Sequence, residues 1–249
     1  MITSIQYNNK TYQIDLSKPI DISIPLRAAD DNVTAWYVGV PKFTPVMENG
    51  FIGDVNLGGA VNFRNIFFNP HGNGTHTECV GHISKEQHTI NKCLQEFFFL
   101  AEVISVTPER IATDSIITQE QIEQVWQNNG AKAIIIRTLP NNKNKLLMQY
   151  SNTNPTFMDN KAAQFLTNNG IEHLLIDTPS VDREEDGGLL KAHHVFWEYP
   201  HNTQQQRTIT ELVFVPDAVL DGSYFLNIQI ASFENDASPS KPVLFRINS

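Results

Sequence analysis

Phe97–Val106 (FFFLAEVISV), followed by Ala133–Arg137 (AIIIR), decides the class of fold. Both segments are apolar runs typical of strands that are buried on two faces. Between them, Thr118 stands three residues before Gln121, which predicts a capping box at the start of a helix that Gly130 closes. A helix between two buried strands indicates an α/β protein.

Further strands and one more helix are predicted on both sides of this unit. Alternating residues around Asn8-Asn9 predict a peripheral hairpin over about residues 1–17. A second helix is predicted over Met158–Asn168, ahead of a buried strand at Ile171–Ile176. The other predicted strands are Ile20–Pro25, Val61–Phe68, Ile209–Val215, Tyr224–Ile230 and Val243–Ile247. With no repeat and no clear linker, we predict one domain over residues 1–249, with a mixed sheet and few helices.

Composition excludes several classes of protein. The chain has 249 residues, 41% of them hydrophobic, and a formal charge of −9 from 18 Lys+Arg and 27 Asp+Glu. This acidity disfavours a nucleic-acid partner, which requires a basic face. Two cysteines do not build a disulfide framework in a chain of this length. No apolar stretch approaches the roughly 20 residues of a membrane span, and no signal peptide is recognisable, so we expect a cytoplasmic protein without a membrane partner.

The segment His71–His82 (HGNGTHTECVGH) concentrates groups that bind metals. It holds three of the eight histidines, together with Glu78. Imidazole nitrogens and carboxylate oxygens are ligands that suit Zn²⁺ and similar ions. His76 and Glu78 are two residues apart, so they point the same way if the chain is extended. The segment matches neither HExxH nor a cysteine-rich zinc pattern, so a solvated, histidine-rich loop is the alternative.

A second group of histidines and acids lies downstream. Asp177–Asp182 follows the predicted strand at Ile171–Ile176, at the end of a strand where site loops often gather. His193-His194 comes next, and Glu211 then interrupts an apolar strand. A buried carboxylate there requires a partner, whereas on an edge strand it faces solvent. His173 lies within a buried strand and is assigned a structural role.

These residues resemble the cyclase-like metal-dependent hydrolases, a family that includes bacterial kynurenine formamidase and isatin hydrolase. Gly74-Thr75-His76-x-Glu78-x-x-x-His82 is similar to the family motif His-x-Gly-Thr-His-x-Asp-x-Pro-x-His. Ile176-Asp177-x-Pro-Ser-x-Asp182, a later histidine, Glu211 and the ending Asp236–Arg246 follow in the family's order. The resemblance covers about residues 18–249 and implies a swivelling β/β/α architecture.

The resemblance also implies the roles of individual residues. His76 and Glu78 match metal ligands, although the family has Asp at the second position. The family's first histidine falls on Gly72 here, so His71 reaches the metal only if the chain bulges by one residue. For the downstream histidine, His193 is preferred to His194. The predicted metal ligands are His71, His76, Glu78, His82, His193 and Glu211, and the predicted catalytic residues are His82, His193 and Glu211.

The implied activity is hydrolysis of an amide-type C–N bond by a metal-activated water. A formamide, a cyclic amide or a related small molecule is the expected substrate, as for an arylformamidase or a cyclic amidohydrolase. One or two ions of Zn²⁺ or Mn²⁺ are the expected cofactor, and a homodimer or homotetramer is the expected assembly. The alternatives are a metal-dependent lyase, dehydratase or ester/lactone hydrolase on the same site, and a metal-binding member without catalysis.

Overall fold

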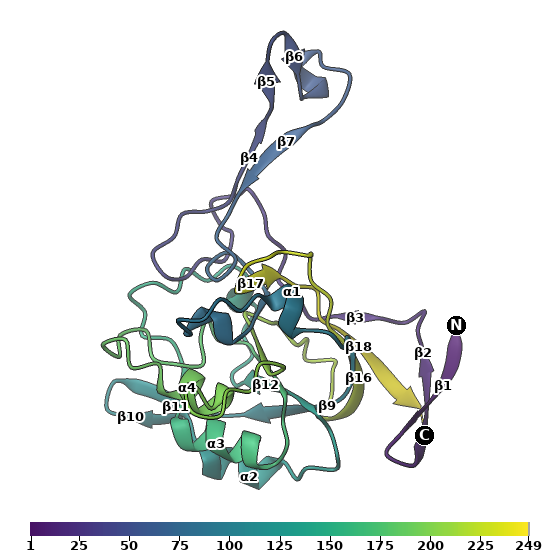
Figure 1. Cartoon of the computed structure of the whole chain (residues 1–249), viewed down its shortest axis with the longest axis vertical. Helices are drawn as coiled ribbons and strands as arrows, with labels where there is room; N and C mark the ends of the chain where they lie inside the picture. Colours follow the sequence, from purple (N-terminus) through teal and green to yellow (C-terminus); the bar gives the residue numbers. More distant parts are fainter. Residues whose placement is uncertain (249) are drawn as a thin grey trace.

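A large mixed sheet organises the computed structural model, which describes residues 1–248 (Figure 1). Its path runs β1-β2-β18-β16-β9-β12-β14-β15-β8-β17, and β3 pairs with β18 beside it. The bounds of these strands are β1 Ile2–Tyr7, β2 Lys10–Asp15, β3 Ile20–Asp21, β8 His76–Glu78, β9 Phe98–Val106, β12 Ala133–Thr138, β14 His173–Ile176, β15 Thr208–Glu211, β16 Gly222–Asn227, β17 Ala237–Pro239 and β18 Val243–Asn248. The predicted mixed α/β class is confirmed.

The centre of the sheet is parallel and buried on both faces. Strands β9, β12, β14 and β15 run parallel, while β16 joins β9, and β8 joins β15, in the antiparallel sense. Along β12, Ile134 and Ile136 pack on the side that also holds Ala162, Leu166 and Phe196 of the helices. The alternate residues Ala133 and Ile135 pack in a second core on the opposite face. This two-sided burial explains why the central strands are continuous apolar runs.

Few helices accompany the sheet. The α-helices are α1 Ile90–Cys93, α2 Gln119–Val125, α3 Asn160–Asn168 and α4 Lys191–Trp197, and the 3₁₀ turns are η1 Val55–Leu57, η2 Val80–His82 and η3 Lys143–Leu146. The predicted capping box of Thr118 and Gln121 is confirmed at the start of α2. The prediction that this helix extends to Gly130 is wrong. Trp126 is already extended and buries its side chain in the core, and this packing ends the helix early.

The N-terminal hairpin has the predicted turn. Tyr7 lies opposite Lys10, and Asn8 and Asn9 between them have φ of 49° and 60°. Two left-handed residues of this kind match the twist of an antiparallel pair, and asparagine tolerates the conformation. Strand β2 continues the main sheet through β18, and Ile14 is buried between Phe225 and Phe245. The hairpin therefore forms one edge of the sheet (Figure 1).

The predicted strand at Val61–Phe68 lies in an arm that projects from the body of the molecule (Figure 1). The arm comprises β4 Lys42–Pro45, β5 Met47–Glu48, β6 Phe51–Ile52, η1 and β7 Arg64–Phe67. Strand β7 pairs with β4, starts only at Arg64, and is exposed along its whole length. The apolar, β-branched sequence of this segment therefore does not indicate burial within one chain.

Several of the remaining strands are shorter than predicted. Strand β15 ends at Glu211 because Leu212 has a φ of 54°, which interrupts the ladder that its apolar sequence suggested would reach Val215. A small sheet of β10 Glu109–Ile111, β11 Asp114–Ile117 and β13 Phe157–Met158 flanks the loops after the parallel strands. Within residues 1–248, no helix has both the length and the apolar character needed to cross a bilayer.

Candidate metal centre

The ladder between β15 and β8 brings two distant parts of the sequence together. Glu211 lies opposite His76, and Ile209 lies opposite Glu78. On the other side of β8, Pro239 of β17 is opposite His76, so β8 is enclosed by two neighbours. His76, Glu78 and Glu211 are all buried, which excludes the interpretation of Glu211 as a solvent-facing residue of an edge strand.

A turn before β8 brings His71 into the cluster, although His71 lies one residue before the position of the family's first histidine. The Asn69 side chain accepts a hydrogen bond from the backbone N–H of Gly72, and the Asn69 backbone donates to the side chain of Asn73. Gly72 is packed so tightly that an added Cβ atom would lie 2.5 Å from Val38 Cγ2 and 2.9 Å from the carbonyl oxygen of Ala35. A residue with a side chain would therefore not fit at position 72, and the ring of the preceding His71 lies beside Glu78.

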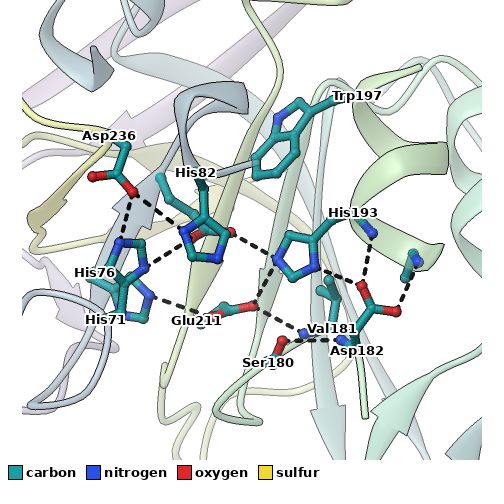
Figure 2. Close-up of polar contacts among 12 residues, drawn as sticks. His71, His76, His82, Ser180, Val181, Asp182, His193, Trp197, Glu211 and Asp236 are labelled. Atoms are coloured by element: carbon teal, nitrogen blue, oxygen red, sulfur yellow. Dashed lines mark hydrogen bonds and ion pairs between the residues drawn. The ribbon is translucent and has the colours of Figure 1, made fainter. Parts of the chain in front are cut away.

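His71, His82 and Asp236 form one end of the cluster (Figure 2). His71 Nε2 is 2.9 Å, and His82 Nδ1 3.3 Å, from Asp236 Oδ2. The other ring nitrogen of His71, Nδ1, is 3.1 Å from Glu78 Oε2. His82 comes from η2 and is the most exposed histidine of the cluster, so this end opens toward solvent.

His193 and Asp182 form the opposite, buried end (Figure 2). His193 Nδ1 is 2.7 Å from Asp182 Oδ2, and its Nε2 is 3.1 Å from Glu78 Oε1. Asp182 also accepts the backbone N–H groups of Ala192 and His193, which fixes it against the first turn of α4. The Asp182 contact holds His193 in the tautomer with hydrogen on Nδ1 when the ring is neutral, so Nε2 faces the cluster.

His76 and Glu211 complete the cluster between these ends. His76 Nδ1 lies 3.1 Å from the carbonyl oxygen of Gly74 and donates to it, which leaves the Nε2 lone pair directed inward. That Nε2 is 3.4 Å from Glu211 Oε2. The other oxygen of Glu211 accepts the backbone N–H of Val181 at 3.0 Å, so Glu211 is held between β8 and the loop that ends at Asp182.

The carboxylates shift the titration of the histidines. Burial acts to lower the pKa of His71, but the Asp236 and Glu78 carboxylates outweigh it and raise the pKa to about 10. Burial likewise opposes the Asp182 and Glu78 carboxylates at His193, and the net result is again a pKa of about 10. The neighbouring imidazoles hold the pKa of Asp236 and of Glu78 below the usual range despite the burial of both side chains. In the metal-free fold, these contacts therefore favour the protonated form of each histidine and the ionised form of each carboxylate.

The donor set fits a divalent cation. His76 Nε2 and Glu78 Oε2 are fully buried, and among the described residues neither makes a hydrogen bond of good geometry, although Glu211 and His71 respectively lie within ion-pair distance. Unsatisfied buried polar atoms are rare in folded proteins and call for an explanation such as an ion. Ligand atoms lie within 4.8 Å of one another in three overlapping groups: His71, His82 and Asp236; His71, His76 and Glu78; and Glu78, His82 and His193. Nitrogen and carboxylate donors in this arrangement are typical of sites for divalent metal ions.

All six residues singled out in the sequence lie in this cluster, and two acids that were not singled out join them. Asp182 and Asp236 were visible only as the last residue of one motif and the first of another. Their part depends on contacts across 11 and 165 residues of chain, which no local pattern encodes. His194 points elsewhere and bonds the carbonyl of Tyr199. His173 bonds Thr208 in the core, and burial lowers its pKa to about 3.

The chain is similar to known proteins in sequence and in fold. Residues 14–183 match the family model described as "Putative cyclase". A kynurenine formamidase from Bacillus cytotoxicus is 27% identical over 234 residues, which are 92% of this chain and 97% of that protein. An isatin hydrolase bound to the product analogue thioisatinate superposes with a TM-score of 0.69 at 12% identity, over 93% of each chain. A predicted metal-dependent hydrolase from Bacillus stearothermophilus gives 0.64 at 19% identity, over 92% of this chain and 98% of that one. The chain belongs to the cyclase family.

Proposed function

We propose that this protein is a metal-dependent hydrolase that cleaves an amide-type C–N bond in a small molecule. The observation that carries the proposal is the cluster of four histidines and four carboxylates around two buried ligand atoms that make no hydrogen bond. The names of the similar proteins, kynurenine formamidase and isatin hydrolase, support a formamide or a cyclic amide as the substrate class.

One or two ions of Zn²⁺ or Mn²⁺ are the proposed cofactor. His71, His76 and Glu78 would hold one ion, with His82, His193, Asp236 and Glu211 available for a second ion or for proton transfer. When bound, such an ion lowers the pKa of a coordinated water toward about 7 and polarises a carbonyl group. Because each oxygen of Glu78 faces a different histidine, this one carboxylate is able to serve two neighbouring ligand positions.

The residues of the chain supply the proton transfers. His193 is held by Asp182 on one nitrogen and presents the other to Glu78 and Glu211, which is the arrangement of an oriented general base. His82 is the histidine nearest to solvent, and Asp236 orients its ring. It is therefore the group placed to donate a proton to the departing nitrogen. Trp197 packs 5.4 Å from the His193 ring and shields that end from water.

Turnover of an aryl formamide tests the proposal. We expect metal-loaded protein to release formate from formanilide, and His76→Ala to lose both the bound metal and the activity. His194→Ala is the matched control, because this histidine is adjacent to the cluster but outside it. Turnover of lactones or hydroxy acids alone would identify an esterase or a lyase on the same site. Stoichiometric metal with no turnover of any of these compounds would indicate a non-catalytic member.

We further propose that the protein is a homodimer or homotetramer that buries the arm. Large apolar residues are exposed there, including Phe63, Ile66 and Phe67, and an isolated two-stranded ribbon is only marginally stable in water. A second copy of the chain would cover these side chains.

The double variant Ile66→Ser/Phe67→Ser tests this assembly. Light scattering should give the mass of an oligomer for the parent protein and of a monomer for the variant. Leu220→Ser is the control, since this exposed residue lies outside the arm. A monomeric parent protein, or a variant that remains oligomeric, would contradict the proposal.

A further inference from the structure

A cavity of about 330 Å³ lies at the carboxyl ends of the parallel strands β12 and β14. Thr138 closes β12, and Asp177 and Thr178 follow β14, and all three residues line the cavity. This edge of an α/β sheet is where ligands commonly bind. None of the residues of the metal centre lines this cavity. The cavity is therefore separate from the metal centre, and it adjoins the loop that carries Asp182.

The floor of the cavity is a neutral, saturated network. Buried Asp177 accepts hydrogen bonds from the backbone and the hydroxyl of Thr138 at 2.8 and 2.9 Å. Lys145 Nζ donates to Asp177 Oδ2 and to the Thr138 carbonyl oxygen, both at 2.7 Å. The charges of Lys145 and Asp177 therefore cancel, and neither side chain is left with an unmet charge for a ligand.

Two other lining residues have unused donors. The ring of Tyr150 is buried with Val33 and Leu212, yet its hydroxyl has no hydrogen-bonding partner among residues 1–248 and opens into the cavity. The hydroxyl is accessible from the cavity, so it is free to donate to a ligand. Arg110 also lines the cavity, and its guanidinium makes no ion pair with any carboxylate in the described chain. Arg110 and Tyr150 therefore offer a cation without an ion pair among the described residues and a free hydroxyl to the same cavity.

We propose that this cavity binds a small organic carboxylate. The carboxylate would accept hydrogen bonds from Arg110 and from the Tyr150 hydroxyl, and Met148 and Pro155 would contact its carbon skeleton. The planar fork of arginine matches a carboxylate, which favours an anionic ligand over a neutral one. The volume is within the range of small-molecule pockets and the walls are partly apolar, which favours an organic molecule over an inorganic ion.

Calorimetric titration of the metal-loaded protein with benzoate tests the proposal. We expect benzoate to bind about ten times more tightly than its neutral analogue benzamide. Tyr150→Phe deletes only the hydroxyl, and Arg110→Gln only the charge, so each should weaken benzoate binding about tenfold or more. Arg64→Gln, which changes a comparably exposed arginine in the arm, should leave the affinity unchanged. Thermal unfolding establishes that the variants are folded, and Arg110→Gln remains informative if the buried Tyr150 tolerates no change.

Three results would overturn the proposal. The first is the absence of benzoate binding at millimolar concentrations. The second is binding that disappears in His76→Ala but persists in Tyr150→Phe, because benzoate would then occupy the metal centre. The third is inorganic phosphate binding as tightly as benzoate, which would make the cavity a general anion site. The readout is affinity and not turnover, so failure of the proposed hydrolase activity leaves this test intact.

Discussion

Two histidines of the cluster, His71 and His193, are each paired with two carboxylates. Glu78 contacts His71 with one oxygen and His193 with the other. Asp182 contacts the far nitrogen of His193, and Asp236 that of His71 (Figure 2). Each imidazole therefore lies between two carboxylates. This pattern fixes the orientation of both rings without a metal and keeps the site preorganised for one.

Asp182→Asn tests the positioning role of Asp182. The amide cannot stabilise a charged imidazole, so the acid–base midpoint of His193 should fall and the pH–rate profile should move to lower pH. We expect kcat to fall about 10- to 100-fold, as for other residues that orient a ligand or base, with a smaller change in KM. A loss of activity with an unchanged pH profile would show that Asp182 serves only the fold.

At the scale of elements, the metal centre depends on a short strand and the turn that leads into it. Strand β8 has three residues, and its place between β15 and β17 sets which side chains face inward. The preceding turn places His71 one residue out of the family's spacing and relies on the tight packing of Gly72. The close packing of this turn is thus part of what places His71 in the site.

Gly72→Ala tests the turn. Its Cβ atom would overlap Val38 and the backbone of Ala35, and overpacking of this kind costs about 1–3 kcal/mol of unfolding free energy. Because His71 is the adjacent residue, metal affinity should also fall. Gly39→Ala is a matched control, since nothing lies within 4 Å of its added methyl group. Equal stability and equal metal content in the two variants would refute this account of the turn.

At the scale of the whole molecule, the cluster couples stability to pH and to metal. His71 and His193 have pKa values of about 10 in the metal-free fold, against about 6.5 in an unfolded chain. Between these values the native state holds more protons than the unfolded state, so stability falls as pH rises. The contribution of the two imidazoles is complete below about pH 6.5 and is lost as the pH approaches about 10.

Denaturant unfolding of chelated protein at several pH values measures this effect. Each imidazole accounts for at most about 1.4 kcal/mol per pH unit across that window. His193→Gln should make the slope shallower, and His194→Ala should leave it unchanged. A bound metal requires neutral imidazoles, so the metal-loaded protein should lose much less stability over the same range. Identical slopes with and without metal would contradict the assignment of these histidines.

The sequence by itself determined the class of fold and the segment that carries most of the candidate ligands. Apolar runs of strand length and a capping box are local signals, and they correctly located β9, β12 and the start of α2. The density of histidines at residues 71–82 is likewise a local property. Such signals predict elements correctly because burial and hydrogen bonding within one element depend mainly on neighbouring residues.

Tertiary structure alone decided the rest. Pairing of β15 with β8 made Glu211 a partner of His76, and α4 directed His193, and not its neighbour, toward Glu78. Asp182 and Asp236 entered the site through contacts between distant segments, and the apolar strand at residues 61–68 became an exposed arm. These outcomes depend on which surfaces meet once the chain is folded, and a side chain's role in a shared site follows from that packing and not from its sequence neighbours.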